Sequence, residues 1–296
     1  MNCISILIPA RNVDVSSLVK VLHEQAERAA ICYEIIVADD ASDNDEVKAK
    51  NQSIQHLPHV RLMEFSHRQG RSAVRNKLWQ AARYEWFLFI DGDMQIKNPD
   101  FLITYLNYIS PQYAAICGDY ELAELSPQLA QATLRYRYEQ QIKHQRTRSW
   151  RQQHPYRAFR VCNLLIQRAA MAAHPFDEAI QRYGYEDLLL AKELQTASLT
   201  ILHIDNPVLF AHFDSNEQFL RKTEIGLETL FSLRSSLAGL STLLRTVRML
   251  QRFHLVFLLR ALSVRMLPYL RRNLLSAQPS LLLFKVYKFS YFLQIK

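Results

Sequence analysis

Two aspartates separated by one glycine follow a strongly hydrophobic segment, residues 86–90. They are Asp91 and Asp93, with Gly92 between them. Carboxylates on a turn after a buried strand can bind a hard divalent cation, and the glycine lets the backbone approach a phosphate group. In a simple turn the same aspartates would only cap the next helix. The hydrophobic strand before the pair favours the metal site.

A second acidic turn follows another hydrophobic segment, residues 35–38. Asp39 and Asp40 end this segment. A carboxylate at this position can accept hydrogen bonds from the N–H groups of a nucleotide base or from ribose hydroxyls. Helix capping would explain the nearby Ser42 but not two adjacent aspartates, so the doubled acid indicates a nucleotide contact.

Two arginines lie at the start of a predicted helix. Arg71 follows Gly70, and Arg75 lies about one helical turn later. Backbone N–H groups at a helix N-terminus and guanidinium groups both suit phosphate oxygens. Taken alone, this segment would be an ordinary basic helix start.

The pattern of hydrophobic segments explains how these turns can meet. Short β-branched runs alternate with helical stretches, which predicts a mostly parallel sheet with crossover helices. In such sheets ligands bind beyond the carboxyl ends of the strands, where the acidic turns lie. The predicted strands are residues 4–8, 33–38, 60–65, 86–90, 113–117 and 199–204. The predicted helices are residues 15–29, 44–56, 71–83, 99–109, 185–196 and 216–235.

The order of the motifs resembles that of family-two glycosyltransferases of the GT-A fold. The resemblance covers roughly residues 3–230 and implies an α/β, Rossmann-like fold. Its central sheet would be mostly parallel and flanked by helices, with a helical, basic C-terminal tail. The similar segments are residues 4–12, 34–42, 70–76, 91–93, 163–168, 175–178 and 183–187.

The resemblance also implies a role for each candidate residue. Asp187 would be the general base that removes the acceptor proton, with Glu186 beside it; an acidic helix cap is the alternative for Asp187. Asp93 and Asp91 would hold Mn²⁺ or Mg²⁺, which agrees with the need to neutralise a departing diphosphate. Asp40 would contact the nucleotide base. The residues implied near the nucleotide are Pro9, Ala10, Arg11, Asp40, Arg71, Arg75 and Asp91.

The sequence departs from the family pattern at three places. They concern the contact with the nucleotide base, the metal ligands and the number of sugars transferred. Arg11 stands where many members place an aromatic residue against the base. His212 is the histidine nearest to a position where many relatives have one, so it is either a third metal ligand or an unrelated histidine. Residues 145–150 match the Q-x-x-R-W pattern of processive enzymes imperfectly and precede the acidic pair, so we expect transfer of a single sugar.

The composition predicts a folded protein of catalytic size with an appendage. Of 296 residues, 49% are apolar and 22% are charged, which excludes a disordered or fibrous chain. We expect a nucleotide-sugar-binding half at 1–120, an acceptor-side half at 121–235 and a tail at 236–296. The four cysteines form no C-x-x-C pair and the first residues lack a secretory signal, which favours reduced thiols and a cytoplasmic location.

The positive charge is concentrated at the end of the chain. After Glu228 there is no acid, whereas residues 229–296 contain eleven Lys or Arg and many leucines. No uncharged run reaches the ~18 residues that span a bilayer. We therefore expect a peripheral contact with an anionic membrane and no nucleic acid. The resemblance implies that this membrane is the inner face of the plasma membrane. Packing on the body or on a second subunit is the alternative.

Residues 121–160 combine many arginines with aromatic residues. A solvated helix face that leads into a surface loop would explain this composition. A flap that meets an anionic or sugar acceptor is the alternative.

Together the residues and the resemblance imply an inverting glycosyltransferase, and similar enzymes act in cell-surface polysaccharide biosynthesis. It would move one sugar from a nucleotide diphosphate sugar, with a UDP-sugar expected, to a glycan or lipid-linked acceptor. A sugar-phosphate nucleotidyltransferase is one alternative, but residues 9–14 lack its glycine-rich loop. A non-catalytic nucleotide-binding or membrane-binding module would not need Asp91, Asp93 and Asp187 together.

Overall fold

The computed structural model describes residues 3–254 and 256–295, and these residues form two units. The first unit contains the described residues of Met1–Ala123, Gln145–Gln181 and Glu186–His212. The second contains the described residues of Glu124–His144, Arg182–Tyr185 and Phe213–Lys296. Lys296, one of the eleven bases of the predicted tail, lies outside the described residues.

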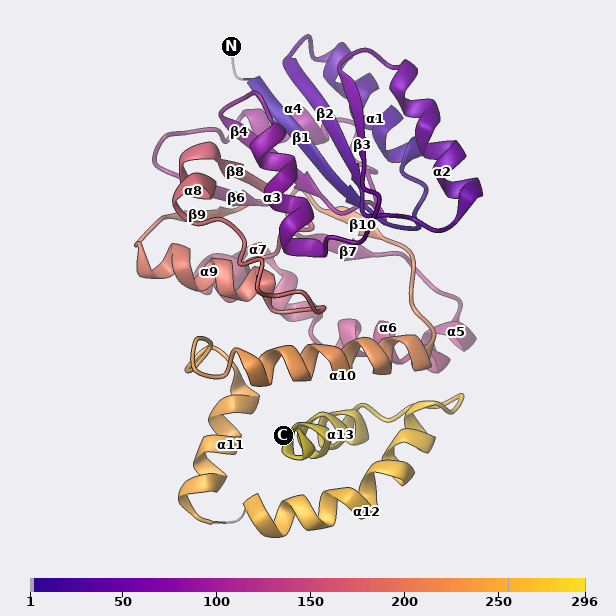
Figure 1. The fold of residues 1–296 in the computed structure, drawn as a ribbon, viewed down its shortest axis with the longest axis vertical. Helices are drawn as coiled ribbons and strands as arrows, with labels where there is room; N and C mark the ends of the chain where they lie inside the picture. The colour runs from indigo at the N-terminus through magenta and orange to yellow at the C-terminus, as the bar shows by residue number, and fades with distance from the viewer. Residues whose placement is uncertain (1–2, 255, 296) are drawn as a thin grey trace. The chain divides into compact units, whose positions relative to one another are not determined.

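A mostly parallel sheet forms the centre of the first unit (Figure 1). Its seven strands have the order β3-β2-β1-β4-β8-β6-β9, and β8 is antiparallel to both of its neighbours. The predicted α/β fold with a mostly parallel central sheet is therefore confirmed. The strands are β1 (Cys3–Ala10), β2 (Cys32–Asp39), β3 (Val60–Glu64), β4 (Trp86–Ile90), β6 (Ala115–Cys117), β8 (Asn163–Gln167) and β9 (Ile201–His203).

Helices cover this sheet on both faces. Every residue of β4 is buried, and so is every residue of β2 after Cys32, as is typical of strands that are covered on both sides. Figure 1 shows α3 in front of the strands. The helices of this unit are α1 (Ser16–Arg28), α2 (Asp45–Gln52), α3 (Arg71–Ala81), α4 (Phe101–Leu106), α7 (Arg148–Gln153), α8 (Arg168–Ala173) and α9 (Glu186–Thr196), with the 3-10 turn η1 (Ser53–His56).

The first unit also contains strands that the sequence patterns did not predict. Besides β8, three short strands form a second sheet in the order β5-β10-β7. They are β5 (Met94–Gln95), β7 (Tyr120–Leu122) and β10 (Val208–Phe210). Strands this short are missed because an alternating pattern needs about four residues to become visible.

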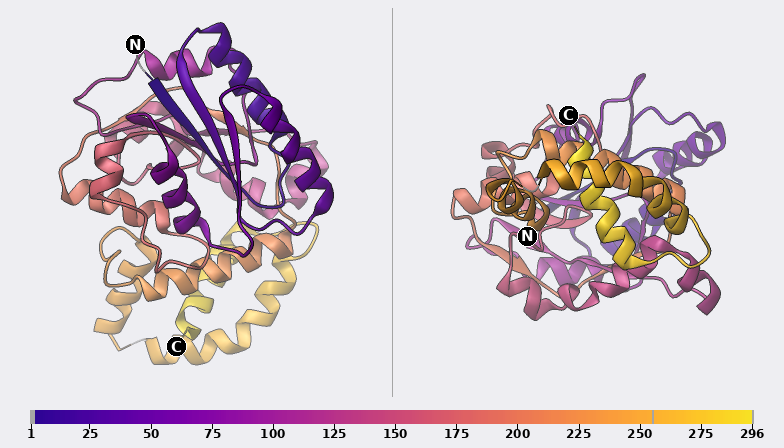
Figure 2. Two further views of the ribbon diagram at one scale, coloured as in Figure 1. Left: turned by 45° about the horizontal axis from the view of Figure 1, so that its top comes forward. Right: turned by 90° about the horizontal axis from the view of Figure 1, so that it is seen from below.

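The second unit is helical (Figures 1 and 2). Phe219, Leu270 and Phe284 lie in one buried cluster that joins its helices. The predicted helical tail is thus confirmed, and no helix of the described residues has the length and hydrophobicity to cross a bilayer. The helices are α5 (Pro127–Ala132), α6 (Leu134–Gln141), α10 (Asn216–Ser232), α11 (Thr242–Arg252), α12 (Val256–Leu274) and α13 (Leu281–Gln294), and the 3-10 turn η2 (Lys143–Arg146) leads back to the first unit.

Candidate active site

The loops after β1, β2 and β4 are joined at the carboxyl edge of the sheet. Gly92 donates its N–H to the Pro9 carbonyl at 3.3 Å, and Asp40 donates its N–H to the Ala10 carbonyl at 2.8 Å. A Cβ at residue 92 would lie 2.9 Å from a side-chain carbon of Val15, so a glycine is required for this approach. Pro9, Ala10 and Asp40, all predicted near the nucleotide, therefore lie at one edge.

Asp40 is buried and orients the start of α3. Its Oδ1 accepts the Gln69 N–H at 2.5 Å, and its Oδ2 accepts the Gly70 N–H at 3.2 Å. Gly70 has a φ of 92°, a left-handed conformation that glycine adopts without strain. The second acidic turn is thus coupled directly to the helix that carries Arg71 and Arg75.

Arg11 lies at the exposed end of the same edge. Its Nη2 is 3.7 Å from Oδ2 of Asp43, and 39% of its side chain is exposed. The next residue, Asn12, donates its backbone N–H to Oγ of Ser42 at 2.7 Å. The loops after β1 and β2 are therefore tied together, and the Arg11 guanidinium remains accessible to a ligand.

Arg75 is the centre of a buried charge cluster. Its side chain is 2% exposed, and its guanidinium lies 5.5 Å from the ring centre of Phe176. Its Nη2 donates to Oδ1 of Asp91 at 2.9 Å, and its Nη1 donates to Oε1 of Glu186 at 3.1 Å. The same Nη1 is 3.5 Å from Oδ1 of Asp187. Three carboxylates predicted from two separate motifs, 91–93 and 183–187, thus meet at one guanidinium.

The charges of this cluster shift its pKa values in opposite directions. Burial raises the pKa of Asp91 and of Glu186, but Arg75 and Arg71 outweigh burial, so both pKa values lie below their usual range. Burial lowers the pKa of Arg75, but the carboxylates outweigh it and the net shift is upward. Arg71 is half-exposed, with its Nη1 3.5 Å from Oε1 of Glu186. Asp91 and Glu186 are therefore weak bases.

Asp187 differs from the other two carboxylates. Burial and the nearby Glu186 raise its pKa to about 6, although Arg75 opposes the shift. Its Oδ2 accepts the Val161 N–H at 3.0 Å, whereas its buried Oδ1 accepts no hydrogen bond from the described residues. A carboxylate with this pKa is ionised at neutral pH yet more basic than an ordinary aspartate, as a general base requires.

The acidic residues after β4 have the oxygen chemistry that a hard cation prefers. In the antiparallel pairing of β10 with β5, Phe210 lies opposite Met94, the residue after Asp93. His212 follows two residues later and is exposed. Within residues 3–254 and 256–295, no group of three or more His, Cys, Asp or Glu is arranged to hold a metal ion. Asp91 and Asp93 therefore offer oxygen donors of the kind that a divalent cation takes.

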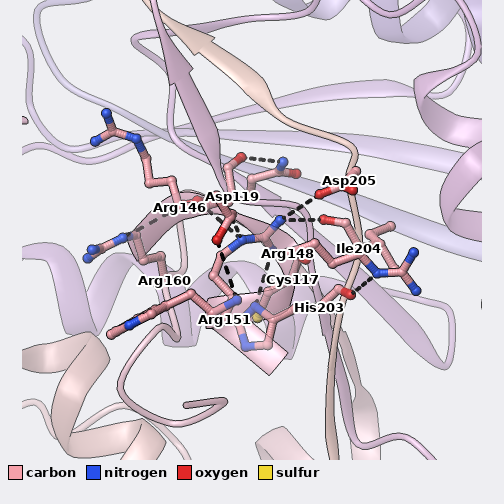
Figure 3. Close-up of polar contacts among 12 residues, drawn as sticks. Cys117, Asp119, Arg146, Arg148, Arg151, Arg160, His203, Ile204 and Asp205 are labelled. Carbon is pink, nitrogen blue, oxygen red and sulfur yellow. Dashed lines mark hydrogen bonds and ion pairs between the residues drawn. The ribbon is translucent and has the colours of Figure 1, made fainter. Parts of the chain in front are cut away.

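A second buried charge cluster was missed by the sequence analysis (Figure 3). Arg151 on α7 is 2% exposed. Its Nε is 3.5 Å from Oδ2 of Asp119, and its Nη2 donates to the Ile204 carbonyl at 2.9 Å. The view of residues 121–160 as a solvated face and surface loop is therefore wrong for Arg151. A buried arginine carries no sequence signal, because its partners are distant in the chain.

Comparison with known protein families assigns most of the first unit to one family. The family model described as glycosyl transferase family 2 matches residues 5–171, more than half of the chain. Among curated proteins, none matches the chain.

Several solved structures share the fold. TarS 1–349 from S. aureus is 15% identical, with a TM-score of 0.51, over 81% of this chain and 66% of that chain. The mannosyltransferase PcManGT from Pyrobaculum calidifontis is 14% identical, with a TM-score of 0.53, over 75% of this chain and 61% of that chain. Mannosyl-3-phosphoglycerate synthase from Rubrobacter xylanophilus is 14% identical, with a TM-score of 0.53, over 79% and 74%.

This chain spans less than two thirds of the TarS fragment and of the mannosyltransferase. At these identities the likeness concerns the fold, and it confirms the predicted GT-A architecture.

Proposed function

The chain belongs to glycosyl transferase family 2, and from that premise we propose that it transfers one sugar from a nucleotide diphosphate sugar to a glycan or lipid-linked acceptor. The observation that carries this proposal is the position of Asp187. Its carboxylate, with a pKa of about 6, lies in the same charge cluster as Asp91 of the acidic turn after β4. The carboxylate that we propose as general base and one that we propose as cation ligand thus both pair with the guanidinium of Arg75.

The proposed reaction forms one bond and breaks one at the anomeric carbon of the donor sugar. Asp187 removes the proton of an acceptor hydroxyl while that oxygen attacks the anomeric carbon. The bond to the diphosphate oxygen breaks on the opposite face, so the configuration inverts and the nucleoside diphosphate leaves. The Val161 N–H fixes the orientation of the Asp187 carboxylate during this step.

The donor side of the proposal uses the other predicted residues. A divalent cation, Mn²⁺ or Mg²⁺, bound by Asp91, Asp93 and His212 would supply positive charge to the departing diphosphate. Asp40 lies at the edge of the sheet that we propose for the nucleotide base. Arg71 offers a half-exposed guanidinium to phosphate oxygens. A UDP-sugar is the donor that we propose, and TarS has been solved with UDP-GlcNAc. PcManGT has been solved with GDP-Man, so the experiment below includes both UDP-sugars and GDP-sugars.

We extend the proposal to location: the enzyme lies on the inner face of the plasma membrane and acts in cell-surface polysaccharide biosynthesis. Among the described residues, eleven large hydrophobic side chains are exposed, and nine of them lie between residues 249 and 282. Arg252, Arg265 and Arg272 are exposed in the same segment. Exposed apolar side chains among arginines suit the boundary between lipid headgroups and acyl chains.

Incubation with a panel of nucleotide sugars tests the catalytic proposal. Purified enzyme is mixed with UDP-, GDP- or dTDP-sugars and Mn²⁺ or Mg²⁺, and free nucleoside diphosphate is measured with and without glycan acceptors. We expect slow hydrolysis of one donor class and faster release with an acceptor. The anomeric configuration of the product is then determined by NMR. Retention of configuration, or no release from any donor, would contradict the proposal.

A further inference from the structure

We propose that Arg146 and Arg160 form an anion-binding subsite that recognises a phosphate group of the acceptor. This inference rests on the proposed glycosyl transfer and adds the substrate class that the acceptor side takes. Both guanidinium groups lie over the same ring, that of Tyr120, at 5.4 Å for Arg146 and 5.8 Å for Arg160. Figure 3 shows these arginines, with Arg151, around the carboxylate of Asp119.

Asp119 is a rigidly held carboxylate that supports this subsite. It is 6% exposed and has a φ of 61°, a left-handed conformation that is costly for a residue with a Cβ. Its Oδ2 is 3.5 Å from Nε of Arg151, and its Oδ1 is 3.8 Å from Nε of Arg160. The carbonyl of Asp119 also accepts a hydrogen bond from the buried Asn163 at 2.8 Å. The carboxylate that faces Arg160 is thus held from several sides.

The segment that carries Arg146 and Arg160 is strongly basic. Residues 145–160 contain five arginines and no acid. Asp119 is the buried carboxylate that pairs with Arg151 and Arg160, and Asp205, which also pairs with Arg151, is 69% exposed. These carboxylates thus pair with a strongly basic segment. A phosphate group suits such a segment, because two guanidinium groups can bind its oxygens through parallel N–H donors.

The subsite is linked to the candidate base through Val161. Arg160 immediately precedes Val161, whose N–H donates to Oδ2 of Asp187 at 3.0 Å. The next residue, Cys162, accepts the Asp91 N–H at 3.2 Å. An anion at Arg160 is therefore close to the point where an acceptor hydroxyl meets Asp187.

The residues proposed for the donor leave these arginines for a second anion. Pro9, Ala10 and Asp40, at the ends of β1 and β2, are proposed for the nucleotide, and Arg71 with a cation for its phosphates. Tyr120 begins β7, whose neighbour β10 also pairs with β5, the strand after Asp93. The UDP-saturated titration below therefore separates an acceptor phosphate from the donor diphosphate.

Calorimetric titration of the full chain with methyl phosphate tests the subsite, with glycerol as the uncharged control. The enzyme is first saturated with UDP and Mn²⁺ so that the donor site is filled. We expect methyl phosphate but not glycerol to bind, and the Arg146→Gln/Arg160→Gln double variant to bind at least tenfold more weakly. Arg157→Gln is the matched control, because Arg157 lies in the same segment but over Trp150, at 5.7 Å. Each single variant is titrated as well, and thermal melting verifies folding.

Three results would overturn the subsite: no binding of methyl phosphate by the wild type, equal binding by the double variant, or competition between methyl phosphate and UDP. Donor hydrolysis without an acceptor separates this inference from the proposed function. The double variant should hydrolyse the donor at the wild-type rate. Failure of the wild type to hydrolyse any donor contradicts the proposed function, whereas the titration still reports on the arginines.

Discussion

Val161 donates its backbone N–H to Oδ2 of Asp187 at 3.0 Å, so the residue two positions before β8 orients the first turn of α9. β8 is antiparallel to β4, the strand that leads into Asp91. The candidate base and the candidate cation ligands are thus positioned by neighbouring strands of one sheet. This arrangement makes the roles of the carboxylates separable by single substitutions.

Replacement of Asp187 by asparagine should remove the base and leave donor binding intact. We expect kcat to fall by about 10² or more, the usual contribution of a positioned general base. Burial raises the pKa of Asp187 from 3.8 to about 6, so wild-type kcat/KM should rise with pH through about 6, where the carboxylate ionises. Initial rates between pH 5 and 8 measure this profile, and the Asp187→Asn variant should lack that rise.

The same shift has a consequence for stability. Because the fold favours the neutral carboxyl, its stabilising contribution is complete below pH 3.8 and is lost as the pH rises through about 6. The loss of stability between these values, measured by urea unfolding, should therefore be smaller in Asp187→Asn than in the wild type. Near-normal turnover of the variant would leave Asp187 as a helix cap, and Glu186 would become the candidate base.

Replacement of Asp93 by alanine should abolish metal-supported donor binding without unfolding the protein. A carboxylate ligand contributes both charge and an oxygen donor, whereas an exposed histidine such as His212 adds only a neutral nitrogen. We therefore expect His212→Ala to weaken Mn²⁺ binding less than Asp93→Ala does. Calorimetry with Mn²⁺ and UDP measures both variants. Asp45→Ala is the control, because its side chain is 98% exposed on α2.

Wild-type affinity for Mn²⁺ and UDP in Asp93→Ala would exclude this residue from the cation site. Equal losses in the two variants would instead make His212 a full ligand.

Replacement of Arg75 by methionine should destabilise the first unit strongly. The change leaves Asp91 and Glu186 without their buried partner, and breaking a buried ion pair in this way costs about 3–5 kcal/mol. Arg71→Met is the matched control, because Arg71 is 49% exposed and lies on the same helix. Its loss should cost no more than about 1 kcal/mol. Urea unfolding measures both, and equal effects would show that Arg75 is not the centre of the cluster.

The strand pattern and the acidic turns could be predicted because their signals are local. The segments before Asp40 and Asp91 are continuous hydrophobic runs, and the turn residues follow them directly. Those runs place the carboxylates at one edge of a parallel sheet without knowledge of any contact.

The interactions between distant segments could not be predicted in the same way. The ion pair between Arg75 and Glu186 joins residues 111 positions apart. The ion pair between Arg151 and Asp119 depends on the strand order of the sheet, which includes the antiparallel strand β8. From sequence alone a charged residue is predicted to be exposed. The free-energy cost of burying it is offset only by partners that the fold brings close. For this reason Arg151 was missed and the central role of Arg75 was not foreseen.

The exposed face of α12 gives the last prediction, which concerns the membrane. Phe257 is 85% exposed and Leu258 is 66% exposed, and Arg265 lies on the same outward side of the helix. We expect the full chain to co-sediment with phosphatidylglycerol vesicles, more weakly at high salt, because exposed charges are screened. The Phe257→Ser/Leu258→Ser variant should bind at least tenfold more weakly, since burial of each side chain contributes roughly 1.5–3 kcal/mol.

Point variants are preferred to removal of the tail, because Leu270 and Phe284 pack with Phe219 on α10 and a truncated chain would expose that cluster. Leu129→Ser is the control, since Leu129 is 57% exposed in the same unit but outside the segment 249–282. Light scattering without vesicles distinguishes the competing explanation. If the wild type is a dimer that Phe257→Ser/Leu258→Ser dissociates, and vesicle binding is equal in the two proteins, then the face of α12 contacts a second subunit and the membrane proposal is wrong.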